Sequence, residues 1–172
     1  AALEEKLVSE DEVFLCEGSY IFSDGTEIGC SYPHGESDLA ASLIKSCNTS
    51  FVQLGQRLGN DLLREYAGKL GIRTELQAGS PPALLGNTSI GQEGVLVSPL
   101  QIANLYATLA RGGIYLPWRI VAEIRNYQGD VIQEYHQQLP QRVLQEETCR
   151  VINQILLETA RNGSGRMAWL EE

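Results

Sequence analysis

Apolar positions recur every three to four residues in several stretches of the chain, and this spacing predicts helices. The clearest start is at Ser98, because a serine followed by a proline and by Gln101 fits a capping box with proline in the first turn. The glycine pair Gly112-Gly113 is expected to end that helix. Three further helices are predicted, from Ser37 or Asp38 towards residue 47, from Asn60 as a cap to Gly71, and from about Gln145 to Asn162-Gly163.

Two β-rich runs flank Gln128-Gly129 within residues 118–135, which predicts a small hairpin. Residues 72–94 are rich in glycine and proline and are expected to form a loop. The chain is therefore predicted to be mainly α-helical with a small β-hairpin. The expected core consists of Leu54, Leu58, Leu62, Tyr66, Leu70, Leu105, Tyr106, Leu109, Ile152, Ile155 and Leu156.

Composition places the chain among ordinary globular domains. It has 172 residues, of which 43% are hydrophobic and 20% are charged, enough to bury a core. The formal net charge is -9 and no basic patch stands out, so no nucleic-acid partner is expected. No apolar run approaches the length that spans a bilayer, so no membrane contact by this chain is expected.

The tripeptide Ser46-Cys47-Asn48 stands where a helix is expected to begin. A serine two residues before an asparagine can place a hydroxyl beside a carboxamide, a pair able to pass a proton and hold a substrate amide. The simpler interpretation is that Ser46 or Asn48 only caps the helix that follows.

Four segments resemble, in order, the transpeptidase domain of penicillin-binding proteins, most closely the class B type that acts in cell elongation. Residues 38–59 contain the S-x-N element, and Ser98-Pro99-Leu100-Gln101 stands where the family has Thr-Pro-Leu-Gln. The similar segments are Ala2–Phe22, Asp38–Gly59, Ser89–Val121 and Asn153–Ala168. The resemblance implies an α+β parent domain of the β-lactamase/transpeptidase type, of which residues 1–172 form a part.

Two of the three catalytic elements of that family are missing. The family uses an S-x-x-K nucleophile, the S-x-N and a K-T-G strand. No lysine here precedes Thr-Gly, and the one S-x-x-K, formed by Ser42 and Lys45, adjoins the S-x-N instead of standing tens of residues before it. We interpret Ser42 and Lys45 as a chance match. In the loop after Ile72, Glu93 also interrupts the Gly-Gln-Gly of the family.

The resemblance implies a fragment of a peptidoglycan D,D-transpeptidase that crosslinks stem peptides and is acylated by β-lactams. Ser46 would relay a proton and Asn48 would hold the substrate amide, while the isolated chain is expected to be inactive. The parent would be extracytoplasmic and membrane-anchored by a segment outside this chain. The missing sheet should leave apolar surface exposed for the rest of the domain or for a homo-oligomer. Two alternatives remain: a serine hydrolase using Ser42 and Lys45, or a non-catalytic helical interaction module.

Cysteine and histidine residues suggest a metal site within residues 10–48, a predicted stapled region that precedes a helical lobe in residues 49–172. Cys16, Cys30, His34 and Cys47 would supply three thiolates and one imidazole, a donor set that fits a structural zinc ion. Some elongation-type members of the family carry zinc in these regions. The open alternative is a Cys16–Cys30 disulfide with Cys47 as a buried thiol. Cys149 is expected in the core and His136 in solvent.

Overall fold

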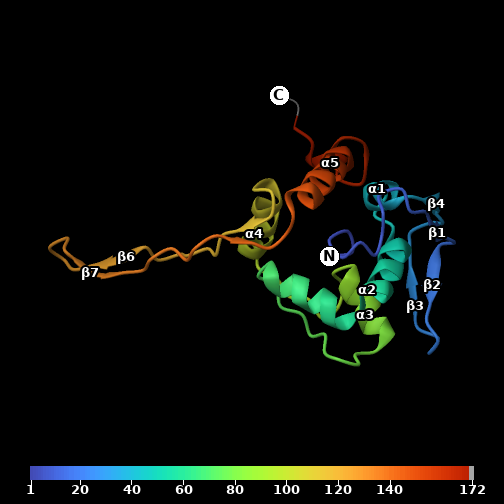
Figure 1. Ribbon diagram of the computed structural model, residues 1–172, viewed down its shortest axis with the longest axis horizontal. Helices are drawn as coiled ribbons and strands as arrows, with labels where there is room; N and C mark the ends of the chain where they lie inside the picture. Colours follow the sequence, from blue (N-terminus) through green and yellow to red (C-terminus); the bar gives the residue numbers. More distant parts are fainter. Residues whose placement is uncertain (171–172) are drawn as a thin grey trace.

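Five α-helices and four two-stranded antiparallel sheets make up residues 1–170, the part of the chain that the computed structural model describes (Figure 1). No helix in this part is both long and apolar enough to cross a membrane. The helices are α1 (Leu39–Ile44), α2 (Asn48–Lys69), α3 (Pro82–Ser89), α4 (Pro99–Ala110) and α5 (Glu146–Asn162), followed by a 3-10 turn, η1 (Arg166–Ala168). The strand pairs are β1 (Phe14–Cys16) with β4 (Gly35–Ser37), β2 (Ser19–Ile21) with β3 (Glu27–Gly29), β5 (Ile114–Tyr115) with β8 (Gln141–Arg142), and β6 (Glu123–Arg125) with β7 (Val131–Glu134).

The predicted helix limits are largely confirmed. Asp38 caps α1 through its carboxylate, which accepts the N–H of Ala41 at 2.7 Å. Ser98 and Gln101 form both bonds of the expected capping box at α4. Helix α5 has Gln145 as its N-cap residue and Gly163 as its C-cap residue.

Helix α2 is two helical segments joined at Gly59, whose φ of 79° and ψ of 168° interrupt the helical backbone. The predicted cap at Asn60 is wrong, because its Nδ2 donates to the carbonyl of Ser80 and its Oδ1 has no hydrogen-bond partner. The predicted end is confirmed, since Gly71 adopts a φ of 75° just beyond Leu70.

The loop expected over residues 72–94 contains a helix, α3, which packs along α2 (Figure 1). Its start is set by Pro82 in the first turn. Gly86 lets α3 approach closely, because a Cβ there would lie 2.6 Å from Cζ of Phe22 and 3.3 Å from Cγ1 of Val52. Gly86 contributed to the loop prediction, but in the structure it allows α3 to pack closely against Phe22 and Val52.

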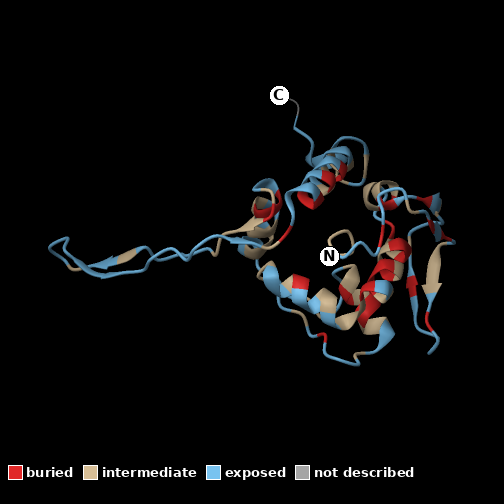
Figure 2. Ribbon diagram, in the orientation of Figure 1, coloured by how far each residue is buried: buried red, intermediate tan, exposed pale blue. Residues whose placement is uncertain are grey.

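Three clusters of buried apolar residues form the core (Figure 2). One surrounds Phe14 and Leu54, a second lies between Tyr66 and Leu109, and a third joins the β2–β3 hairpin to Val52. The predicted core is confirmed except at Tyr106, which is 54% exposed. The remaining predicted positions are buried or partly buried: Leu54, Leu58, Leu62, Leu70, Leu105, Ile152, Ile155 and Leu156, together with Tyr66 and Leu109.

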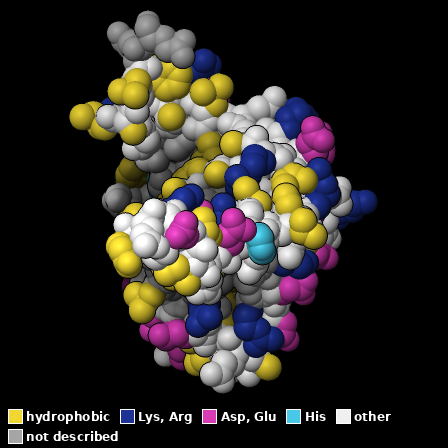
Figure 3. All heavy atoms as spheres, turned by 90° about the vertical axis from the view of Figure 1, so that its left-hand side faces the viewer, with side chains coloured by type: hydrophobic (Ala, Val, Ile, Leu, Met, Phe, Trp, Pro, Cys, Tyr) yellow, Lys and Arg dark blue, Asp and Glu magenta, His cyan; other side chains and the backbone are white. Residues whose placement is uncertain are grey.

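The predicted hairpin is confirmed as β6 and β7, which project away from the helices as a two-stranded arm (Figure 1). Its turn is closed by Asn126, whose side chain accepts the N–H groups of Gln128 and Asp130 at 2.9 Å. Apolar side chains lie exposed among charged ones on the side from which the arm projects (Figure 3). Leu96 and Ile120 are 86% and 83% exposed, so the expected apolar surface is present.

Candidate active-site lobe and cysteine-histidine cluster

The Ser46-Cys47-Asn48 element occupies the turn between α1 and α2. Ser46 has a φ of 55°, a left-handed conformation that is uncommon for a residue with a side chain. Cys47 is the N-cap residue of α2, its side chain makes no capping bond, and Asn48 is the first helical residue. The interpretation of Ser46 or Asn48 as a plain cap is therefore wrong, because neither side chain bonds to the start of α2.

Two distant segments hold this pair. Asn48 Nδ2 donates to the carbonyl of Gly29, at the end of β3, at 2.8 Å. The Oγ atoms of Ser46 and Ser164 lie 2.6 Å apart across a sequence separation of 118 residues. Ser164 follows the C-terminus of α5 and was missed by sequence reasoning, because no local pattern links it to residue 46.

The neighbouring Ser42 and Lys45 do not form a nucleophile and base. Ser42 is fully buried, and its Oγ donates to Oγ of Ser50 at 3.0 Å. Lys45 Nζ donates instead to Oγ of Ser37 at 3.1 Å. Because a nucleophile must be reachable by substrate and activated by its base, this arrangement agrees with a chance S-x-x-K match.

The four predicted metal-ligating side chains converge on one point. The Sγ atoms of Cys16, Cys30 and Cys47 and a ring nitrogen of His34 all lie within 4.8 Å of one another. The separations are 3.7 Å for Cys16–Cys30, 3.9 Å for Cys30–Cys47 and 3.4 Å from Cys16 Sγ to His34 Nδ1. These residues lie on or beside β1, β3, β4 and the start of α2, so the cluster brings the β1–β4 and β2–β3 strand pairs together with α2.

These distances fit a tetrahedral donor set. Ligands about 2.3 Å from a shared zinc ion in tetrahedral geometry are separated by about 3.8 Å. All four cysteines are free thiols, and Cys16 and Cys47 are buried. Cys149 is also buried, as predicted, and lies outside the cluster, while His136 is exposed, as predicted.

Hydrogen bonds favour the thiolate form of Cys16. Burial alone would raise the pKa of Cys16, but hydrogen bonds from the Thr49 hydroxyl and the His34 N–H outweigh it and lower the pKa to about 6. Cys47 Sγ accepts from the Ser50 hydroxyl at 3.1 Å. At Cys30, burial dominates and raises the pKa. The Cys16 and Cys47 sulfurs therefore accept hydrogen bonds from protein groups in place of the water that burial removes.

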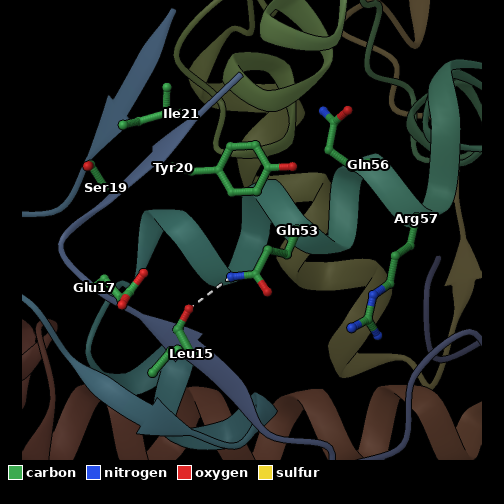
Figure 4. A pocket seen from close by; sticks show the side chains of 8 residues that line it. All are labelled: Leu15, Glu17, Ser19, Tyr20, Ile21, Gln53, Gln56 and Arg57. Atoms are coloured by element: carbon green, nitrogen blue, oxygen red, sulfur yellow. Dashed lines mark hydrogen bonds between the residues drawn. The ribbon is translucent and has the colours of Figure 1, made fainter. Parts of the chain in front are cut away.

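A hollow beside the cluster lies between β1–β2 and the first half of α2 (Figure 4). Gln53 donates to the carbonyl of Leu15 at 3.1 Å, Gln56 donates to the carbonyl of Pro82 at 2.8 Å, and Arg57 pairs with Glu12. These donors are engaged in internal bonds that tie β1, α3 and the segment before β1 to α2, so they are not free to bind a ligand in the hollow.

The fold and site together define the helical lobe of an α+β domain with a serine-asparagine pair at a helix start. The chain belongs to the penicillin binding protein transpeptidase domain family, whose sequence model matches residues 1–169.

Relatives agree in sequence and in structure. Peptidoglycan D,D-transpeptidase PbpA of Mycobacterium tuberculosis is 40% identical over 99 residues, covering 51% of this chain and 20% of that protein. Stage V sporulation protein D of Bacillus subtilis is 28% identical, covering 99% of this chain and 29% of its own length. The D,D-transpeptidase domain of a peptidoglycan glycosyltransferase from Eggerthella lenta superposes with a TM-score of 0.81 at 21% identity, covering 98% of this chain and 48% of that one. A crystal structure of PBPA from M. tuberculosis gives 0.77 at 25% identity, covering 93% and 41%.

Proposed function

We propose that this chain supplies the S-x-N lobe of a peptidoglycan D,D-transpeptidase that crosslinks stem peptides and is acylated by β-lactams. The observation that carries the proposal is the turn before α2, which presents Ser46 and Asn48 free of capping bonds. Ser46 relays a proton towards the leaving amine, and Asn48 holds the substrate amide. The M. tuberculosis relatives support β-lactam binding, because one is described as a penicillin G acyl-enzyme complex.

The catalytic serine and the K-T-G strand are proposed to come from outside these 172 residues. The chain spans only 20% and 29% of the two relatives named above. Among its own residues Ser42 is buried, and no lysine precedes Thr-Gly. The chain alone is therefore expected to release no D-alanine and to take up no fluorescent penicillin. Labelling at Ser42 would favour the serine hydrolase alternative and contradict this assignment.

The test of the site uses a transpeptidase in which this lobe is joined to S-x-x-K and K-T-G elements. Ser46→Ala should slow penicillin acylation about 100-fold or more, since proton transfer by a positioned group contributes roughly 10² to 10⁴. Asn48→Ala should slow it about tenfold, the range expected for the loss of one hydrogen bond to the substrate amide. The matched control is Ser23→Ala, an exposed serine in the β2–β3 turn, which should acylate normally. Normal acylation by Ser46→Ala would refute the proposed role.

We propose further that Cys16, Cys30, His34 and Cys47 hold a structural zinc ion. The supporting observation is that His34 and Cys47 lie at the same point as Cys16 and Cys30. A Cys16–Cys30 disulfide would not require these two further residues to be there. When bound, zinc would cross-link the two hairpins to the start of α2, and Cys3His sites of this kind are structural. Elemental analysis of protein never exposed to chelator should give about one equivalent, and less than about a tenth of an equivalent would end this proposal.

The remaining assignments follow from the same proposal. The intact protein is proposed to work on the outer side of the cytoplasmic membrane, where peptidoglycan is crosslinked, anchored by a segment outside this chain. The exposed apolar residues around Leu96 and Leu100 are proposed to contact the rest of the transpeptidase domain. Analytical ultracentrifugation of the isolated chain should show self-association through this surface, and a monomer at all concentrations would count against the homo-oligomer.

A further inference from the structure

The turn after α5 is fastened directly to the loop that carries Ser46. The N–H of Ser164 donates to the carbonyl of Ile44 at 3.1 Å, and the two serine Oγ atoms lie 2.6 Å apart. One backbone bond and one side-chain bond thus fix the same short segment, two residues apart. A single exposed contact would be easily replaced by water, whereas this pair fixes the position of the loop and brings a second hydroxyl to the Ser46 oxygen, with either serine able to donate.

Gly163 makes the close approach possible. A Cβ at this position would lie 2.7 Å from the carbonyl oxygen of Ile44 and 2.8 Å from its Cγ2. The φ of Gly163 is -104°, which other residues adopt, so the constraint is the space between the two segments. The carbonyl of Thr159 accepts the N–H groups of Gly163 and Gly165, both at 3.1 Å, and holds the turn in place.

We propose that Ser164 is a positioning residue for the proton relay at Ser46. The proposal rests on the catalytic role proposed above for Ser46. A serine hydroxyl carries one proton and two lone pairs. When Ser164 donates its O–H to Ser46 Oγ, it occupies one lone pair and leaves the Ser46 proton free to point into the site.

The proton balance follows from this arrangement. As the S-x-x-K serine Oγ bonds to the β-lactam carbonyl carbon, its proton passes to the lysine of the same motif. That lysine protonates Ser46 Oγ, and Ser46 gives its own hydroxyl proton to the nitrogen released when the C–N bond breaks. Ser164 keeps its own proton throughout and does not touch substrate. Loss of Ser164 should therefore slow the acylation step and leave the initial binding of the β-lactam unchanged.

The test measures the acylation rate constant and the dissociation constant of the preceding complex separately, by stopped-flow with a fluorescent penicillin, in the complete transpeptidase. Ser164→Ala should reduce the rate constant about three- to tenfold, the range expected for one hydroxyl hydrogen bond, with an unchanged dissociation constant. Ser164→Thr should restore the rate, because Ser164 is exposed and an added methyl can be accommodated. Ser23→Ala is the control for loss of an exposed hydroxyl.

A double-mutant cycle separates positioning from a general structural effect. Adding Ser164→Ala to Ser46→Ala should have no further effect on the residual rate, because Ser164 acts only through Ser46. Gly163→Ala should reproduce the loss, because its Cβ would push the turn away from Ile44. An additive effect, or a normal rate in Ser164→Ala, would overturn the inference while leaving the role of Ser46 intact. A normal rate in Ser46→Ala would overturn the proposed function itself.

Discussion

Replacing Cys47 by serine tests whether the cluster stabilises the lobe through a metal. The substitution keeps a small polar side chain at the N-cap position of α2, and serine is a good N-cap residue, so helix initiation should be preserved. It removes the sulfur that, in the proposed zinc site, would connect the start of α2 to the β1–β4 and β2–β3 strand pairs. A cross-link between Cys16 and Cys47 closes a loop of about 30 residues, which corresponds to about 4 kcal/mol of stability on the chain-entropy estimate.

For a chain of this size, about 4 kcal/mol corresponds to a decrease in Tm of about 10 °C. Differential scanning calorimetry of Cys47→Ser and of the chelator-treated chain should show similar decreases. Hydrogen exchange should locate the loosening in residues 14–50, while the helical segment beyond Asn60 remains protected. The matched control is Cys149→Ala, which removes a buried thiol outside the cluster and should retain both the metal and the response to chelator.

Two results would refute the reasoning. One is full zinc content in Cys47→Ser, which would show that this sulfur is not a ligand. The other is a chelator effect spread evenly over all five helices, which would mean that the cluster does not stabilise a local region. A reductant-sensitive stability with no bound zinc would instead indicate the disulfide.

Three further outcomes are expected. Gly55→Ala should destabilise the chain by about 1–3 kcal/mol in urea titration, despite the better helix propensity of alanine. The added Cβ would lie 1.8 Å from Ser89 Oγ and 2.6 Å from Ser89 Cβ. Ser89→Gly should restore the stability, and a double variant that stays destabilised would contradict the packing argument. Ser98→Ala should cost about 1 kcal/mol by the same titration, and Ser98→Thr much less, because the capping box is lost only in the former. In the metal-free chain, Tm should fall as pH is lowered from 9 to 6, since the pKa of Cys16 is about 6 in the fold and near its ordinary 9.0 when unfolded. Cys16→Ser should flatten that dependence, and an unchanged slope would exclude Cys16 as its source.

The sequence predicts the features that depend on local chemistry. Caps such as Asp38 and Ser98 are marked by side chains that bond to their own helix, and the hairpin turn at Gln128-Gly129 is marked by its glycine. The convergence of the four cluster residues was also anticipated, because their donor types and the family resemblance agree.

Features created by tertiary contact were missed. Helix α3 lies in a glycine- and proline-rich segment, and its stability depends on packing against α2. Strands β1–β4 have three residues each, too few to show a periodic pattern. Tyr106 repeats at helical spacing on α4, yet it faces away from the described core because its helix has an apolar face with no partner within residues 1–170.

The distance along the chain between Ser46 and Ser164 also sets the order in which the lobe can assemble. Closing the Ser46–Ser164 contact across 118 residues costs about 1 kcal/mol more loop entropy than closing the cysteine-histidine cluster, which spans about 30 residues. During synthesis, which proceeds from the N-terminus, the cluster can close while α5 is still unmade. The Ser46 loop acquires Ser164 as a partner only when the turn after α5 has left the ribosome, so a nascent or prematurely terminated chain could form the cluster but not the Ser46–Ser164 contact.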